Sequence, residues 1–250
     1  MENLKTFWQK SRPQNSAQGG ILHKSWRYFI WSLKAALFTL LLTIFQLNSA
    51  EASHFRYGDI SWRVVESDPT GRTIEFKVNT GWRLNAVNTI YLRFGDGTGA
   101  YMSRVITNVN GEYSYSTGTV RHTYASNGNY TAFYSGCCKI SNLANNRDDS
   151  WYMRTVVNVG TGNNSPVTTV PAIVNLQTNQ SQAKFFIPAT DPDGDNLSFA
   201  LASTAHGWPS GSTHPSGISV NSSTGEVTFN TNGRGIGTLW NTAVAISDGK

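Results

Sequence analysis

Three aspartates at alternating positions are the best candidates for metal chemistry in this 250-residue chain. Asp191, Asp193 and Asp195 lie in the segment DPDGD. If this segment is extended, alternate side chains point to the same side, so the three carboxylates would face one ion. Hard oxygen ligands at such short range suit Ca²⁺. We therefore expect a calcium site here, and the alternative is a polar turn in which an aspartate caps freed backbone N–H groups.

The spacing of these carboxylates excludes an EF-hand loop. Gly194 stands at the fourth position instead of the sixth, and Ala202 occupies the twelfth, where a bidentate glutamate is required. Asp248 is a further candidate ligand. In an Ig-like sandwich the loop between the second and third strands lies at the same end as the loop between the sixth and seventh, which would bring Asp248 toward the other three.

Cys137 and Cys138 are adjacent and are the only cysteines in the chain. Their Cα atoms would lie about 3.8 Å apart across a trans peptide, below the usual ~4.4–6.8 Å of a disulfide. Export to an oxidising compartment nevertheless favours a bond, and Gly136 allows the chain to leave strand geometry. We expect a vicinal disulfide that locks a turn or also offers a sugar or aromatic group a flat surface; two free thiols are the alternative.

Trp208 is the candidate aromatic contact for a ligand. It lies in the polar loop 205–214, where few apolar neighbours exist to bury it. It either stacks on a carbohydrate or partner protein, or folds back over the rim of the fold, as large aromatic side chains tend to do. Other tryptophans, Trp240 among them, are expected in cores or at sheet edges.

No catalytic residue is expected. The segment SQAK at 181–184 matches serine-x-x-lysine, but it precedes a strand and its companion motifs are missing. The alternating glycines Gly233, Gly235 and Gly237 precede a strand and not a helix, which excludes a phosphate-binding loop. His122, which begins the segment HTY at 122–124, is interpreted as a structural histidine of that strand and not as a metal ligand. His54, His206 and His214 show no metal-ligand spacing with one another.

Residues 1–52 are predicted to be a signal peptide. Six basic residues precede the apolar stretch 35–47, which is short for a membrane span and suits a signal core. The sequence Ala50-Glu51-Ala52 fits a cleavage site, so the mature chain would begin at Ser53. The alternative is an uncleaved signal anchor over residues 28–47, if Lys34 is tolerated in the span.

The remaining chain is nearly neutral. Residues 1–52 hold six of the 20 basic and two of the 15 acidic residues, which leaves 14 against 13. Such a surface offers no field for phosphate binding, so a nucleic-acid partner is excluded. Since no sustained apolar period of 3.6 occurs, we expect an all-β protein with almost no helix, built as two tandem Ig-like β-sandwiches.

The first sandwich is expected over residues 53–162. Strands are predicted at 54–65, 73–78, 89–94, 118–124, 130–134 and 151–159. The turn FGDG at 94–97 and the segment HTYASNGNYTA at 122–132 together resemble the PKD domain, an Ig-like sandwich. The resemblance implies a domain that binds or spaces and does not catalyse.

The second sandwich is expected over residues 167–250, after a linker at 163–166. Its motifs run in order from DPDGD through PSGISVN at 215–221 and TGEV at 224–227 to the closing Asp248-Gly249. This order resembles the cadherin-like, or Ig-like dystroglycan-type, modules of bacterial surface proteins. In such modules a further strand follows the aspartate-glycine pair, so we expect a C-terminally truncated domain with an open edge.

These features predict a secreted or cell-surface protein that is not an enzyme. We expect a binding or adhesion module that presents its loops to an extracellular protein or carbohydrate and is stiffened by calcium. Membrane attachment would come only from an uncleaved signal or from a domain beyond Lys250. The alternative is the non-catalytic N-terminal part of a larger secreted polysaccharidase or protease, because PKD-type domains accompany such enzymes.

Overall fold

The computed structural model describes residues 31, 34, 55–84, 89–111 and 113–250. Residues Ala52–Lys250 form one compact unit, separate from Met1–Glu51. The predicted signal peptide and its cleavage site lie outside the described residues, apart from Trp31 and Lys34. From residue 55 onward the described chain consists of strands and loops with a single three-residue 3₁₀ helix, η1 (Thr204–His206), which confirms the all-β prediction.

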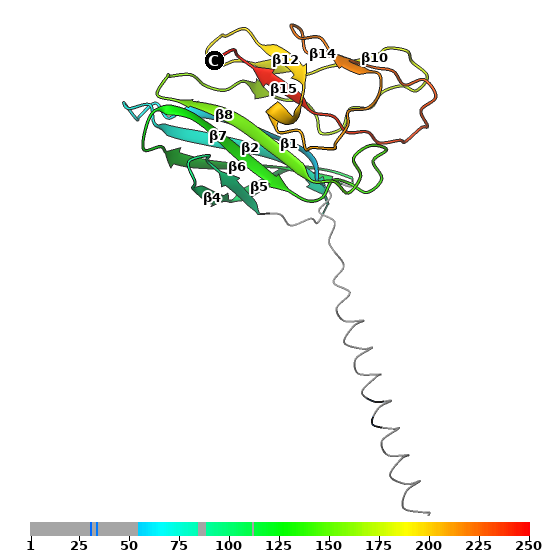
Figure 1. The fold of residues 1–250 in the computed structure, drawn as a ribbon, viewed down its shortest axis with the longest axis horizontal. Coiled ribbons are helices and arrows are strands. Elements are labelled where there is room, and N and C mark those ends of the chain that lie inside the picture. The colour runs from blue at the N-terminus through cyan, green and yellow to red at the C-terminus, as the bar shows by residue number, and fades with distance from the viewer. Residues whose placement is uncertain (1–30, 32–33, 35–54, 85–88, 112) are drawn as a thin grey trace, which may run out of the picture. The chain divides into compact units, whose positions relative to one another are not determined.

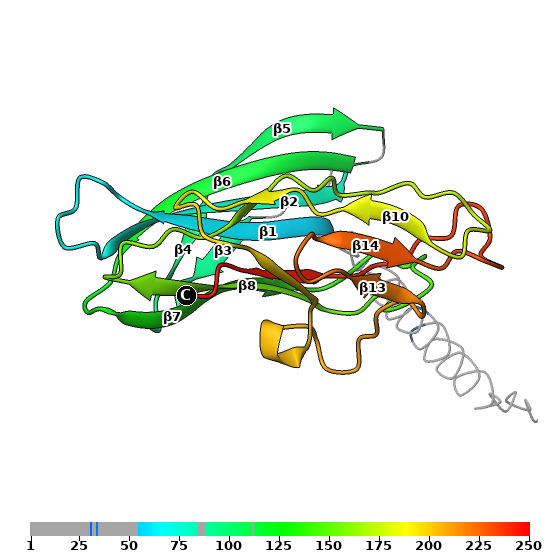
Figure 2. The ribbon, with the colours of Figure 1, turned by 90° about the horizontal axis from the view of Figure 1, so that it is seen from above.

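Strands β1–β8 form two four-stranded antiparallel sheets (Figures 1 and 2). The first sheet has the order β1-β2-β6-β5 and the second β4-β3-β7-β8. Their bounds are β1 (Phe55–Val64), β2 (Thr73–Arg83), β3 (Ile90–Arg93), β4 (Gly99–Met102), β5 (Arg104–Asn110), β6 (Tyr113–Thr123), β7 (Gly128–Gly136) and β8 (Trp151–Val159). Strands β4 and β5 were not predicted from the sequence.

The core of this sandwich lies between the two sheets. On β2 the alternate residues Ile74, Phe76 and Val78 are fully buried, as the period of two along that strand predicts. The second sheet contributes Leu92 and Val157 to the same apolar cluster. On the opposite face of β2, Glu75 bonds to arginines of both neighbouring strands, at 2.6 Å from Arg63 and 2.8 Å from Arg121.

The two halves of the sequence signature meet in this sandwich. Asp96, in the turn after β3, lies 2.6 Å from His122 Nε2 at the end of β6. The His122 ring stacks on Phe94 at a centroid distance of 4.1 Å. The hydroxyl of Tyr124 donates to the Phe94 carbonyl oxygen at 2.8 Å. His122 therefore joins the turn to β6, in agreement with its interpretation as a structural residue.

Strands β9–β15 form three small antiparallel sheets, ordered β10-β14-β13, β11-β9 and β12-β15. Ile187, Phe199 and Val227 form the centre of their core. The bounds are β9 (Val167–Thr168), β10 (Ala183–Phe186), β11 (Ala189–Thr190), β12 (Ser198–Leu201), β13 (Ile218–Val220), β14 (Glu226–Phe229) and β15 (Val244–Ser247). None of these strands pairs with any of β1–β8 in the described sheets; the isolated bridge between Leu143 and Leu239 links the two sets.

The segment 163–166, predicted as a linker, lies against β1. Ser165 N donates to the Trp62 carbonyl oxygen at 3.0 Å, and Trp62 N donates to Ser165 Oγ at 2.8 Å. Val64 N donates to the side-chain oxygen of Asn164 at 2.9 Å. Because Asn163 and Ser165 are buried, this segment is held in place and is not an extended, solvated tether.

Candidate functional site

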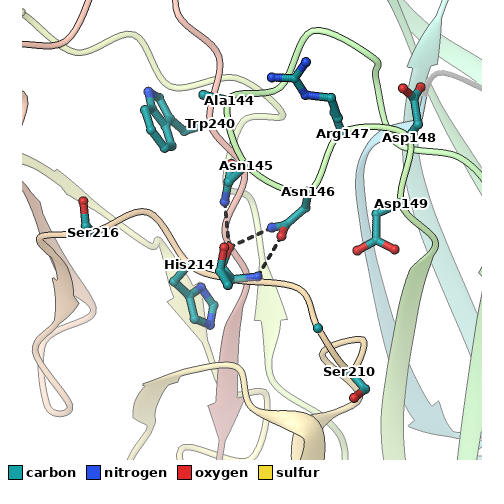
Figure 3. Close-up of a pocket in the computed structure, with 12 residues that line it drawn as sticks. Ala144, Asn145, Asn146, Arg147, Asp148, Asp149, Ser210, His214, Ser216 and Trp240 are labelled. Atoms are coloured by element: carbon teal, nitrogen blue, oxygen red, sulfur yellow. Dashed lines mark hydrogen bonds between the residues drawn. The ribbon is translucent and has the colours of Figure 1, made fainter.

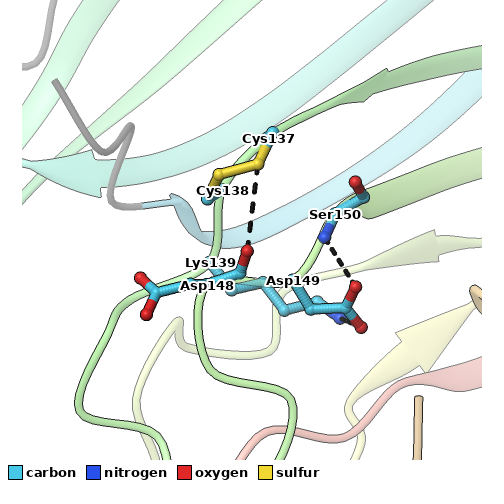
Figure 4. The surroundings of a disulfide bond; sticks show 6 residues. All are labelled: Cys137, Cys138, Lys139, Asp148, Asp149 and Ser150. Carbon is cyan, nitrogen blue, oxygen red and sulfur yellow. Dashed lines mark hydrogen bonds and ion pairs between the residues drawn. A yellow bond between two sulfur atoms is a disulfide. The ribbon is translucent and has the colours of Figure 1, made fainter. Parts of the chain in front are cut away.

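The loop between β7 and β8 holds or contacts two of the candidate features, the cysteine pair and Trp208. Cys137 and Cys138, at its start, are joined by a disulfide (Figure 4). Cys137 is exposed, and its Sγ lies 3.9 Å from the Asp148 carbonyl oxygen across the loop. Lys139 N donates to the Asp149 carbonyl oxygen at 2.9 Å, which closes the loop at its base.

Two asparagines attach this loop to segments of the second strand set. Asn145 Nδ2 donates to the carbonyl oxygens of Thr213 at 2.7 Å and Asn241 at 2.9 Å. Asn146 bonds to both backbone groups of Thr213 and to the Asn241 side chain (Figure 3). The left-handed backbone of Asn146, with φ of 55°, is a conformation that asparagine adopts more readily than most residues. The loop is therefore fixed by contacts 67 to 96 residues away in sequence.

A buried lysine is part of this loop. Lys139 is 4% exposed, and its ammonium lies 3.5 Å from Asp149 Oδ2 and 3.3 Å from Ser212 Oγ. Burial lowers the pKa of Lys139, although the Asp149 carboxylate opposes this shift. The Ser212 hydroxyl donates to Asp149 and is the main cause that lowers the pKa of Asp149. The hydrogen bond from Ser212 therefore lowers the pKa of Asp149 more than the charge of Lys139 does.

Trp208 folds back onto its own loop. Its ring stacks on His214 at 4.6 Å between centroids, and its Nε1 donates to the Ser212 carbonyl oxygen at 3.0 Å. The Lys139 ammonium lies 5.1 Å from the centre of the Trp208 ring. His214 in turn bonds to the Ala202 carbonyl oxygen at 2.7 Å. The Trp208 ring is therefore in contact with its own loop and with Lys139 of the β7–β8 loop.

These loops surround a hollow of about 850 Å³. Trp240 and Ser216 lie on one side of it, and Asp148 and Asp149 lie on the other (Figure 3). The full lining comprises Ala144, Asn145, Asn146, Arg147, Asp148, Asp149, Ser210, Gly211, Thr213, His214, Ser216 and Trp240. Trp208, Cys137 and Cys138 do not line it, although Trp208 stacks on His214 and Cys137 lies against Asp148, both of which do.

Sequence reasoning missed most of this lining. Trp240 was expected in a core or at a sheet edge, whereas it is half-buried beside the hollow with the Arg234 guanidinium 4.2 Å from its ring centre. The signal that could have drawn attention to the β7–β8 loop is its composition. The segment NNRDD at 145–149 places five polar residues in succession, next to the cysteine pair.

The acidic loop forms a compact carboxylate cluster. One oxygen from each of Asp191, Asp193 and Asp195 lies within 4.8 Å of the others. Asp191 Oδ1 accepts the backbone N–H groups of Asp193 at 2.9 Å and Asp195 at 3.2 Å. The Asp191 carboxylate thus caps the turn through two backbone N–H groups.

Each of the outer aspartates also has a partner of its own. Asn164 binds both oxygens of Asp193, and Lys250 Nζ lies 3.3 Å from Asp195. Asp248 accepts a hydrogen bond from Asn163 at 2.9 Å and is not part of the three-carboxylate group. Asp191 Oδ2 differs from these, because it is buried and has no hydrogen-bond partner in the described chain. An oxygen of this kind fits a cation, which would supply the missing partner.

The first sandwich is the part of the chain that matches a known family. Residues 56–160 match the profile described as "Integrin beta-like protein A-E, N-terminal". This range runs from β1 to the end of β8. This part of the chain is similar to integrin beta-like N-terminal domains. The profile covers less than half of the 250 residues.

Curated relatives extend the similarity into the second strand set. Integrin beta-like protein A of Dictyostelium discoideum is 31% identical over 244 residues, which cover 86% of this chain and 12% of that protein. Integrin beta-like protein C of the same organism is 32% identical over 213 residues, 74% of this chain and 11% of that protein. The chain therefore spans only about an eighth of the length of these relatives. No solved structure matches the chain.

These matches refine the resemblances seen in the motifs. They agree with a β-sandwich domain, and they name neither the PKD nor the cadherin-like family. None of the matched names is that of an enzyme. Among the described residues, no helix has the length and apolar character that a membrane crossing requires.

Proposed function

We propose that this chain is a non-catalytic binding and adhesion module of a secreted or cell-surface protein. The observation that carries the proposal is the hollow between the β7–β8 loop and the loop 208–216, held open by long-range side-chain bonds and lined by exposed charged groups. The similarity to integrin beta-like proteins supports the same function. The predicted leader at residues 1–52 would direct the chain outside the cytoplasm.

The character of the hollow favours a polar partner, either an extracellular protein or a carbohydrate. Trp240 offers an aromatic surface whose position is fixed by the Arg234 side chain, which also bonds to the Ser216 and Asn230 carbonyl oxygens at 2.6 and 2.7 Å. Arg147 and Asp148 place opposite charges side by side on the opposite rim. Mixed charges beside an aromatic surface suit hydrogen-bonding recognition more than an apolar or polyanionic ligand.

Calcium is the second element of the proposal. Asp191, Asp193 and Asp195 would hold the ion, with Asp248 able to join only if it leaves Asn163. The buried, unpartnered Asp191 oxygen supports this site. Since Asn163 and Asn164 bond to Asp248 and Asp193, an ion here would stiffen the acidic loop next to the segment that connects the two strand sets.

An adhesion assay tests the binding function. We expect beads coated with the full chain to attach to Dictyostelium discoideum cells more than albumin-coated beads do. The double variant Arg147→Ala/Asp148→Ala should reduce attachment roughly tenfold if these residues are at the centre of the contact. The matched control is Lys184→Ala/Glu226→Ala, which removes an exposed ion pair on the β10–β14 sheet and should change nothing.

The same assay identifies the partner class. Protease treatment of the cells should abolish attachment to a protein partner, and periodate oxidation of surface sugars should abolish attachment to a carbohydrate. Attachment equal to that of albumin beads, or equal loss in the variant and its control, would contradict the proposed site.

A further inference from the structure

The edge strand β5 has three exposed aliphatic side chains, more than any other strand of the first sandwich. Val105, Ile106 and Val109 are 62%, 54% and 54% exposed. β5 lies at the end of the sheet order β1-β2-β6-β5, beside β6 (Figure 2). No described strand pairs with its other side.

The register shows which face of the sheet these side chains occupy. Ile106 is opposite Ser116 of β6, and Val109 is opposite Ser114. Ser116 and Ser114 are in turn opposite Thr80 and Trp82 of β2. Directly opposed residues of an antiparallel sheet share one face. Ile106 and Val109 therefore lie on the face that carries the buried residues of the core.

The core-side face of the first sheet is buried at β2 and β6 and exposed to solvent at β5. Thr80, Trp82, Ser114 and Ser116 are at most 3% exposed, whereas Ile106 is 54% exposed. The first sheet thus extends beyond the cover that the second sheet provides, and the uncovered strip is aliphatic. Exposed apolar strips next to a row of open backbone groups are pairing sites.

The usual protection of an edge strand is weak here. The strand RVITNVN has no proline and no lysine, and its only charged residue is Arg104 at one end. Besides Arg104, a register irregularity between Ile106 and Asn108 interrupts the edge. Aliphatic and β-branched residues on both sides of this irregularity favour a further strand.

We propose that β5 is a dimerisation edge, at which the β5 strand of a second copy pairs antiparallel and continues the first sheet. A two-fold axis perpendicular to the sheet leaves the core-side faces of the two copies on the same side of the joined sheet. Ile106 and Val109 of one copy then lie beside Ile106 and Val109 of the other. Antiparallel pairing also puts the two Arg104 side chains at opposite ends of the strand pair, so no like charges oppose each other. The strand is in this sense complementary to itself.

Sedimentation equilibrium of the full chain tests the dimer. We expect a monomer–dimer equilibrium within about 1–100 µM, a range typical of modest interfaces. Ile106→Lys and Val109→Lys should each raise the dissociation constant at least about tenfold, because they bury a charge at the new strand pair. Ile236→Lys is the matched control: Ile236 is 94% exposed, lies in a loop distant in sequence, and should leave the equilibrium unchanged.

Hydrogen exchange tests strand pairing itself. Amides of residues 105–110 should become more protected as protein concentration rises, and circular dichroism should show that the lysine variants keep the native fold. A monomer at every concentration, a dimer that both lysine variants retain, or a dimer whose β5 amides exchange as they do in the monomer would each overturn the proposal.

Discussion

At the scale of single residues, the candidate site depends on polar side chains that satisfy one another. Asn145 and Asn146 form hydrogen bonds with the backbone groups of Thr213, and the Ser212 hydroxyl donates to the Asp149 carboxylate. Polar groups buried at such a contact need hydrogen-bond partners, because an unpaired one costs about 1–3 kcal/mol. The arrangement therefore fixes the loop and leaves Arg147 and Asp148 exposed on its rim.

Asp149→Asn should destabilise the protein by about 1–2 kcal/mol at neutral pH, a value reduced for the partial exposure of this carboxylate. The amide cannot act as the charged acceptor for Ser212 and Lys139. Because the folded protein lowers the pKa of Asp149, chiefly through Ser212, the stabilisation is present above the ordinary aspartate pKa and is lost as pH falls through the lowered value.

Urea denaturation between neutral and acidic pH measures this effect. The stability difference between the wild type and Asp149→Asn should shrink as pH falls below about 4, the ordinary aspartate range. Asp148→Asn is the control, since it removes an exposed carboxylate from the same loop. A difference that stays constant with pH would show that the charge of Asp149 does not contribute.

At the scale of elements, the turn that joins β3 to β4 also contacts β6 and β7. Asp96 accepts hydrogen bonds from Thr98 N at 2.9 Å and approaches His122 at the end of β6. Burial raises the pKa of Asp96, but the bonds from Thr98 and His122 outweigh it and lower the pKa overall. Gly95 lies where the turn passes β7, and its backbone has φ of 88°.

Gly95→Ala should be far more destabilising than Gly97→Ala. Both glycines have positive φ, so alanine at either position costs about 1 kcal/mol of backbone strain. A Cβ on Gly95 would also lie 2.7 Å from Thr131 N, in the β7 backbone, whereas a Cβ on Gly97 meets nothing within 4 Å. We expect a further loss of about 2–3 kcal/mol for Gly95→Ala alone. Chemical denaturation of both variants checks this, and equal losses would contradict the close approach.

At the scale of the whole molecule, short polar segments join the two strand sets. Asn163, Asn164 and Ser165 bond to residues on both sides of the connection. Ala172 N also donates to the Tyr115 hydroxyl at 2.8 Å, which ties the second set to β6. An ion bound by the acidic loop would therefore stabilise more than the loop itself.

Thermal unfolding with calcium and with EDTA tests the proposed ion. A metal that binds only the folded state raises the midpoint by mass action, and extracellular modules often have dissociation constants of about 10⁻⁴ to 10⁻³ M. Millimolar calcium should raise the midpoint, and Asp191→Asn should abolish the increase by removing the carboxylate whose second oxygen is unpartnered. Asp193→Ala and Asp195→Ala should also abolish it.

The calcium-dependent difference is the relevant readout, because Asp193→Ala also removes the bonds to Asn164 and should lower the midpoint in EDTA as well. Glu226→Gln, on the β14 strand, serves as a control that keeps the increase. Equal midpoints of the wild-type protein in both buffers would mean that the acidic loop is a polar turn only.

The sequence alone determined the all-β class, most strands of the first sandwich and the turn at FGDG. These features are local. The alternation of Ile74, Phe76 and Val78 indicates a buried strand face, and Gly95 and Gly97 indicate a turn because glycine adopts positive φ more readily than other residues. β5 was not predicted because it lacks such a local pattern. Both of its faces are exposed, so no alternation of apolar and polar residues marks it.

Only the tertiary structure decided where the candidate site lies. The β7–β8 loop and the loop 208–216 are brought together by bonds such as that between Asn145 and Asn241, 96 residues apart. Local patterns along a chain specify which face of a strand is buried, and they carry no information on which distant loops meet. Trp208 was visible in the sequence as an aromatic residue in a polar loop, yet its stacking on His214, and the exposure of Trp240 to the hollow in its place, follow from how those loops pack.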